Sequence, residues 1–151
     1  MKINGFEEIA AWQEARKLVR MVYEVIRKSK EFQKDFRLVN QIQDASVSTM
    51  SNIAERFSRK GNKEFMQFLF ISKSSASEVQ SHLYVALDQG YVAEKDFSET
   101  YKQADLLSKM VSSFIKYLSE ATKAICLTIW FLTLLAKQTQ KPYIAFQPYK
   151  P

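Results

Sequence analysis

The lone histidine and the lone cysteine are the first side chains to test for chemistry. Ser81 precedes His82, but triad members cannot converge from one helical run, and no G-x-S-x-G turn occurs. Cys126 lies in the most apolar stretch of the chain, where a thiol usually acts as a small hydrophobic side chain. One histidine with one thiol also gives no zinc-binding set. These residues predict no catalytic centre and no metal site.

Other motifs of catalysis are missing from the sequence as well. It has no G-x-x-x-x-G-K-[ST] loop and no G-x-G-x-x-G turn, which disfavours nucleotide hydrolysis. Acidic pairs such as Glu7 with Glu8 lack the Glu-x-x-His partners of di-iron bundles, so we interpret them as helix caps and solvated faces. We therefore expect a protein without enzymatic activity and without a cofactor.

Basic side chains gather in two places where they could bind phosphates. The first set follows one flank of the first predicted helix and comprises Arg16, Lys17, Arg20, Arg27 and Lys28. The second set surrounds a predicted turn and comprises Arg56, Arg59, Lys60 and Lys63. Such side chains bind nucleic-acid backbones without reading their sequence. The alternative is a solvated helix face whose charges pair in part with Glu24 and Glu31, and both interpretations stay open at this point.

The distribution of charge also favours a polyanionic partner. The net charge is +6, and residues 1–60, 61–120 and 121–151 carry +4, −2 and +4 respectively. A basic first half attracts polyanions at long range, although net charge also serves solubility.

The segment Ser51-Asn52-Ile53-Ala54-Glu55 places two polar residues in the middle of an apolar helical period. Asn52 and Glu55 either form hydrogen bonds across the fold and fix the register of its helices, or contact a ligand at one end of it. We favour the structural interpretation, because the two residues lie among core positions and have no His or Lys nearby to activate.

Apolar residues recur at three- and four-residue steps in four segments, at about residues 7–28, 36–57, 63–89 and 94–118. Asp35 is expected to cap the second helix, and Gly90 is expected to end the third in a left-handed conformation. Residues 29–34 break the period. Ser72, Ser75 and Ala76 allow a neighbouring helix to approach closely. The sequence, with 3 Gly and 3 Pro, predicts an all-α fold, an antiparallel up-down-up-down four-helix bundle.

The chain after Glu120 has a different character. Residues 124–136 carry no charge, and all three prolines follow them. We divide the chain into a four-helix bundle at 1–120 and a C-terminal extension at 121–151, with the last helix continuing to about Lys137 because no stop signal intervenes. These 13 residues are fewer than the about 20 that a transmembrane helix needs, so no membrane span is expected. The N-terminus lacks a secretory core, which predicts a cytoplasmic protein.

Three large side chains fall outside the main apolar stripe of the third helix: Met66, Phe70 and Tyr84. An isolated bundle would leave them in water, so contact with another subunit is one explanation.

Several short motifs together resemble a known family, and they are Trp12-Gln13, Ser51-Asn52-Ile53-Ala54-Glu55, Lys63-Glu64-Phe65 and Gly90-Tyr91. The chain resembles, over residues 6–118, the four-helix bundle proteins encoded in intervening sequences of bacterial 23S rRNA genes. It is also similar to the accessory variability protein of diversity-generating retroelements. This resemblance implies a small antiparallel bundle, commonly a homopentamer, with no established enzymatic activity. The retroelement relatives bind nucleic acid and a reverse transcriptase.

The chain departs from the family pattern at three positions. Gln43 and Asp44 stand where the family often has arginines, which weakens the basic surface, and Arg56 stands where a glycine is usual. We therefore predict a non-enzymatic homo-oligomer, with a pentamer favoured, that binds RNA or DNA through its basic surface. It could serve as an adaptor for a nucleic-acid enzyme such as a reverse transcriptase. The alternatives are a protein-binding scaffold without nucleic-acid binding and an enzyme with an unrecognised site.

Overall fold

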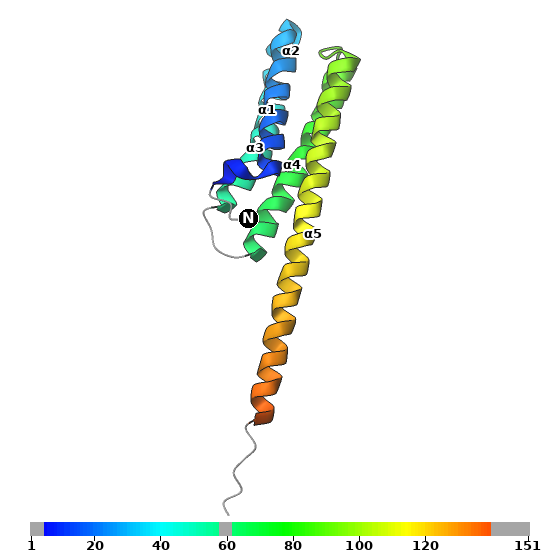
Figure 1. The fold of residues 1–151 in the computed structure, drawn as a ribbon. Helices are drawn as coiled ribbons and strands as arrows, with labels where there is room; N and C mark the ends of the chain where they lie inside the picture. Colours follow the sequence, from blue (N-terminus) through cyan, green and yellow to red (C-terminus); the bar gives the residue numbers. More distant parts are fainter. Residues whose placement is uncertain (1–4, 58–61, 140–151) are drawn as a thin grey trace, which may run out of the picture.

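The computed structural model describes residues 5–57 and 62–139, and these residues form helices joined by short connections (Figure 1). A 3-10 turn, η1 (Phe6–Glu8), precedes the helices α1 (Ala10–Lys28), α2 (Lys30–Lys34), α3 (Phe36–Phe57), α4 (Asn62–Asp88) and α5 (Glu94–Thr139). No strand occurs in this part of the chain. The predicted all-α class is therefore confirmed.

The first helix begins three residues later than the sequence predicted. The Phe6 ring packs edge-on against the Trp12 ring, with their centroids 5.1 Å apart. The side-chain amide of Gln13 donates to the Glu7 carbonyl at 2.9 Å. These two contacts fold η1 back onto the first turn of α1, so Glu7 lies in the turn rather than in the long helix.

The break predicted at residues 29–34 contains a short helix, α2. Ser29 caps this helix by accepting a hydrogen bond from the Phe32 backbone N–H at 3.1 Å. Phe32 is fully buried and stacks on Tyr91 with a centroid separation of 5.4 Å. The Asp35 carboxylate accepts from the Leu38 N–H at 3.1 Å, so the N-cap predicted at Asp35 is confirmed.

Small polar side chains line the contact between α3 and α4. Ser72 and Ser75 are buried, as is Ala76, and the Ser72 hydroxyl donates to the Thr49 carbonyl across the two helices at 2.8 Å. A hydroxyl can reach the backbone of a neighbouring helix only when the two axes lie close together. The predicted close approach at these small residues is therefore confirmed.

The turn between α4 and α5 also matches the sequence prediction. Gly90 has a φ of +68°, the left-handed conformation in which glycine meets no penalty from a Cβ atom. The Tyr91 N–H donates back to the Ala86 carbonyl at 2.8 Å, which ends α4. The chain then reverses, so that α4 and α5 lie side by side in opposite directions (Figure 1).

The core lies between the long helices, where α1 packs against α3 and α5, and α4 packs against the same two helices. It includes the fully buried side chains of Leu18, Ile42, Ile53, Leu83 and Leu107. Burial along α5 ends at Leu118, while the helix itself continues to Thr139 and projects beyond the other helices (Figure 1).

The continuation of the last helix to about Lys137 agrees with α5. The boundary placed between residues 120 and 121 stays a prediction. Within the described residues, no helix has both the length and the apolar character to cross a membrane.

Candidate nucleic-acid interface

An open hollow runs along the outer face of α1, and one helix supplies all of its lining. The lining residues are Lys17, Val19, Arg20, Met21, Tyr23, Glu24 and Arg27. Because residues three and four apart lie on the same face of a helix, the basic flank predicted from the sequence becomes one continuous surface. We call this surface, together with Arg16, the α1 basic face.

Arg16 extends the α1 basic face by one turn toward the N-terminus. Its side chain is exposed, and its guanidinium carbon lies 5.9 Å from the centre of the Trp12 ring. A guanidinium at this distance is attracted to the negative face of the ring. Arg16 precedes Arg20 by four residues, so the two charges lie on the same side of α1.

Acidic side chains neutralise only part of the α1 basic face. The Lys17 ammonium lies 3.9 Å from the Glu14 carboxylate, and Glu24 lies within the hollow itself. Arg20 and Arg27 are exposed, and neither forms an ion pair with another residue of the described chain. These two guanidinium groups keep their donors available to an external anion.

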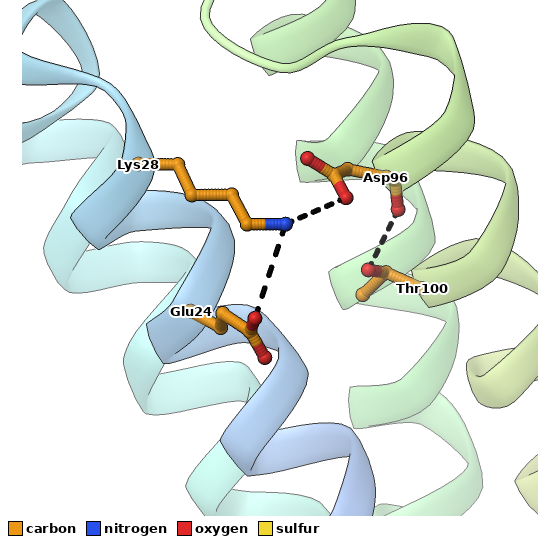
Figure 2. Close-up of polar contacts among 4 residues, drawn as sticks. All are labelled: Glu24, Lys28, Asp96 and Thr100. Carbon is orange, nitrogen blue, oxygen red and sulfur yellow. Dashed lines mark hydrogen bonds and ion pairs between the residues drawn. The ribbon is translucent and has the colours of Figure 1, made fainter.

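Lys28 is engaged elsewhere, in a bridge between α1 and α5 (Figure 2). Its ammonium lies 2.8 Å from the Asp96 carboxylate and 3.9 Å from that of Glu24, and the Asp96 carbonyl accepts from the Thr100 hydroxyl at 2.8 Å. The hydrogen bond to Asp96 raises the pKa of Lys28 above its ordinary value. Since two carboxylates already hold this charge, we leave Lys28 out of the proposed interface.

The second basic set predicted from the sequence cannot be placed. Arg59 and Lys60 lie outside the described residues. Arg56 and Lys63 belong to the ends of α3 and α4, but their side chains lie outside the described part as well. The assignment of these four residues to a nucleic-acid surface therefore stays a prediction.

Tyr23 is a member of the α1 basic face that the sequence analysis missed. Its side chain is 39% exposed and lines the hollow between Arg20 and Arg27. The helical period could have found it, because Tyr23 follows Arg20 by three residues and precedes Arg27 by four. An exposed ring between two guanidinium groups offers a flat surface as well as charge.

The side chain of Asn52 forms hydrogen bonds within the fold. Its amide donates to the Ser48 carbonyl at 2.8 Å and to the Ser48 hydroxyl at 3.0 Å. The Ser48 hydroxyl in turn lies 2.9 Å from the Ser75 hydroxyl of α4. This chain of hydrogen bonds supports the structural interpretation of Asn52, with Ser48 as the link to the neighbouring helix. Glu55 is exposed on the outside of α3.

The three residues assigned to an oligomer interface have different surroundings. Met66 is half-buried and packs against the core, so the protein itself covers part of this side chain, and its assignment to an interface stays a prediction. Tyr84 is 51% exposed but contacts the rings of Phe97 and Tyr101 in α5, at 5.0 and 5.7 Å. The electrostatic interaction with Tyr84 is the largest of the effects that raise the pKa of Tyr101 above its ordinary value. Phe70, at 56% exposure, is the most exposed of the three.

The residues tested first for catalysis lie apart from the α1 basic face. His82 of α4 is half-buried, with its Nε2 atom 3.6 Å from the Glu78 carboxylate, while the Ser81 side chain is exposed. Cys126 is exposed near the far end of α5. Among the described residues, no group of His, Cys, Asp and Glu side chains is arranged to hold a metal ion.

Comparison with known families identifies the family to which the region around the α1 basic face belongs. The model of the 23S rRNA-intervening sequence protein family matches residues 7–113. The chain belongs to this family. The resemblance seen in the sequence is thereby confirmed, and the family region includes the whole α1 basic face but ends before the last part of α5.

A solved structure supports the same fold. It is the crystal structure of a protein of unknown function from the S23 ribosomal protein family of Bacteroides thetaiotaomicron, which superposes with a TM-score of 0.64 at 22% sequence identity. The match covers 70% of this chain and 95% of that one. At this identity the likeness concerns the fold alone. No curated protein matches the chain.

Proposed function

We propose that this protein binds the phosphates of RNA or DNA through the α1 basic face and catalyses no reaction. The observation that carries the proposal is the pair Arg20 and Arg27, two exposed guanidinium groups without an ion pair in the described chain. Guanidinium groups suit phosphate because their planar donors match two oxygens at once.

The spacing along α1 fits a nucleic-acid strand. Arg20 and Arg27 are seven residues apart, which is about 10.5 Å along a helix axis. At this separation the two guanidinium groups are too far apart to share one phosphate, so each can contact a different phosphate of the same strand. Tyr23 lies between them, where a base of a single strand could stack on its ring.

Assembly would multiply this contact. The pairwise packing of α1 and α4 against α3 and α5 supports an antiparallel up-down-up-down bundle, and the exposed Phe70 supports a homo-oligomer of such bundles. The family resemblance, and no feature of the structure, favours a pentamer. Symmetry repeats the α1 basic face once per subunit, and repeated weak contacts to one polyanion combine into tight binding.

The oligomer has a direct test in light scattering. Phe70→Glu should dissociate it, because the change places a charge in an apolar contact. Ser113→Glu, at an exposed position of α5, is the matched control and should leave the assembly intact. A monodisperse 17.6 kDa species for the unmodified protein at micromolar concentration would contradict the oligomer.

The resemblance to retroelement accessory proteins supports a role as an adaptor for a nucleic-acid enzyme such as a reverse transcriptase, and we place this role in the cytoplasm. The second candidate function is a protein-binding scaffold that does not bind nucleic acid. Glu24, which lies among the basic side chains of the hollow, favours this second candidate because it would repel a phosphate.

Fluorescence anisotropy with a labelled single-stranded RNA separates the two candidates. Binding by the unmodified protein should fall steeply with salt, because each neutralised phosphate releases counterions. Arg20→Glu with Arg27→Glu should weaken binding at least tenfold and lower the salt slope by about two, one for each phosphate that the variant no longer neutralises.

Lys102→Glu with Lys116→Glu is the matched control, because it changes the net charge equally at two exposed positions of α5. This control should bind RNA nearly as well as the unmodified protein. Equal losses in both double variants would mean that net charge alone attracts RNA. Unchanged binding after the arginine substitutions would favour the second basic set, and an unmodified protein that does not bind RNA would favour the scaffold function.

A further inference from the structure

We propose that the end of α5, residues 121–139, docks the protein onto an anionic lipid bilayer; we call this segment the α5 extension. Five large apolar side chains in its described part are each more than half exposed: Ile125, Leu127, Ile129, Trp130 and Leu132. A soluble monomer rarely presents so much contiguous apolar surface, so this segment requires an apolar environment from outside the chain.

The apolar side chains lie on opposite sides of the helix. Ile125, Ile129 and Leu132 follow one another at steps of four and three residues, so they form one stripe. Leu127 and Trp130 form a second stripe on the other side. A partner helix covers one such stripe, whereas hydrocarbon covers a helix all round. The two stripes therefore favour lipid over a paired helix.

Polar side chains in the α5 extension bond to its own backbone. The hydroxyl of Thr122 donates to the Leu118 carbonyl at 2.8 Å, that of Thr128 to the Ala124 carbonyl at 2.9 Å, and that of Thr133 to the Trp130 carbonyl at 2.7 Å. Hydroxyl groups satisfied in this way need no water and enter an apolar medium at low cost.

The lysines that flank the uncharged run favour anionic lipid over a second copy of the chain as the partner of this segment. Residues 121–151 contain four lysines and no acidic residue, and Lys123 and Lys137 flank the uncharged run 124–136. Pairing with a second copy would bring lysines together in a parallel arrangement and would place Lys123 opposite Lys137 in an antiparallel one. Anionic headgroups instead complement both ends of the run.

The dimensions of the run agree with insertion parallel to the bilayer plane. Its 13 residues extend about 20 Å, which falls short of the about 30 Å of the whole hydrocarbon core, so the run does not span it. A helix about 10 Å across that lies in the plane fits within the about 15 Å of one leaflet and keeps both ends of the run near the headgroups. Cys126, Leu127 and Trp130 form an open apolar surface beside Lys123, which an acyl chain could contact next to a positive charge. The segment projects beyond the other helices, which leaves it accessible to a flat surface (Figure 1).

Vesicle flotation with the full chain tests this proposal. The protein should float with vesicles that contain phosphatidylglycerol and should bind them about 30-fold more tightly than vesicles of phosphatidylcholine alone, at roughly fivefold for each flanking lysine. In Trp12→Phe, Trp130 is the one remaining tryptophan, and its emission should shift to shorter wavelength when vesicles are added.

Leu127→Asn with Ile129→Asn should abolish flotation, because it removes one apolar side chain from each side of the helix. Ile71→Asn with Leu106→Asn changes two exposed apolar residues of α4 and α5 outside the extension and should float normally. Circular dichroism checks that both double variants stay helical. A protein that does not bind anionic vesicles would overturn the proposal. So would self-association that the first double variant abolishes while vesicles have no effect, because a second copy would then cover the extension.

Discussion

The two halves of α5 have the same helical backbone and opposite surroundings. From residue 94 to 118 the helix has a buried face, which comprises Thr100, Gln103, Ala104, Leu107, Val111 and Leu118. In the α5 extension, no described side chain is buried. The family match ends at residue 113, close to the end of this buried face. The backbone hydrogen bonds of a helix are made within one segment, whereas burial depends on the helices that lie alongside it.

Contacts to other helices follow the same division. Asp96 is tied to Lys28 of α1, and the Gln103 amide donates to the backbone carbonyl and the carboxylate of Glu14 at 3.1 and 2.6 Å. The Phe114 ring packs edge-on against Phe65 of α4 at 5.0 Å. The described hydroxyls of the α5 extension bond to the backbone of α5 itself. The first half is held by its neighbours, and the second half is held by its own turns.

A pair of leucine substitutions should show the largest difference between the two halves. Leu107→Ala removes a fully buried side chain and should lower the free energy of unfolding by about 2–5 kcal/mol. Leu127→Ala, in a side chain that is 66% exposed, should change it by less than about 0.5 kcal/mol. Urea denaturation followed by circular dichroism measures both values. Equal losses would mean that the α5 extension is packed in solution.

Breaking the bridge between α1 and α5 should have a smaller effect, and the effect should depend on pH. Asp96 raises the pKa of Lys28 in the folded state, so the bridge stabilises the protein below the unfolded lysine pKa, and this stability is lost as pH rises through the folded pKa. Asp96→Asn should therefore lower the melting temperature at neutral pH by a fraction of the Leu107→Ala effect. It should also reduce the loss of stability above about pH 10.

Asp105→Asn is the control for this bridge, because Asp105 pairs with Lys109 on the surface of α5 alone. It removes an equal charge without breaking a contact between helices, so its melting curves should follow those of the unmodified protein. A difference in alkaline stability as large as that of Asp96→Asn would assign the effect to net charge.

Removal of residues 121–151 should have the smallest effect on stability. If the core ends near Leu118, the shortened chain should unfold with a free energy within about 0.5 kcal/mol of the full chain, and its solubility should improve. Urea denaturation and light scattering measure these two properties. Global unfolding of the shortened chain would show that the extension belongs to the core and that the domain boundary is misplaced.

The sequence predicted those parts of the fold that local chemistry decides. Asp35 and Gly90 mark helix ends because a carboxylate cap and a left-handed glycine act within a few residues. The short helix α2 was missed because five residues are too few to show a helical period. It is held in place by the burial of Phe32 against Tyr91, a contact between residues 59 positions apart.

The candidate site was predicted only in part, for the same reason. Arg16, Arg20 and Arg27 share one face by helical geometry alone, which the sequence can indicate. Lys28 lies slightly further round the helix, but a carboxylate 68 positions away holds its ammonium, and nothing local in the sequence indicates that partner. Exposure is likewise a tertiary property, and it is the exposure of Tyr23 that makes its ring available to a ligand.

The hydroxyl contacts between α3 and α4 have a consequence for how the chain folds. Two helices with purely aliphatic faces can dock one turn out of step at little cost, because one methyl group replaces another. Here a slip of about 5.4 Å would separate the Ser72 hydroxyl from the Thr49 carbonyl and leave the buried hydroxyl without this partner. Such a misdocked pair would separate again more readily than the native one. These hydroxyls therefore disfavour a shifted register of α3 and α4 from an early stage of folding.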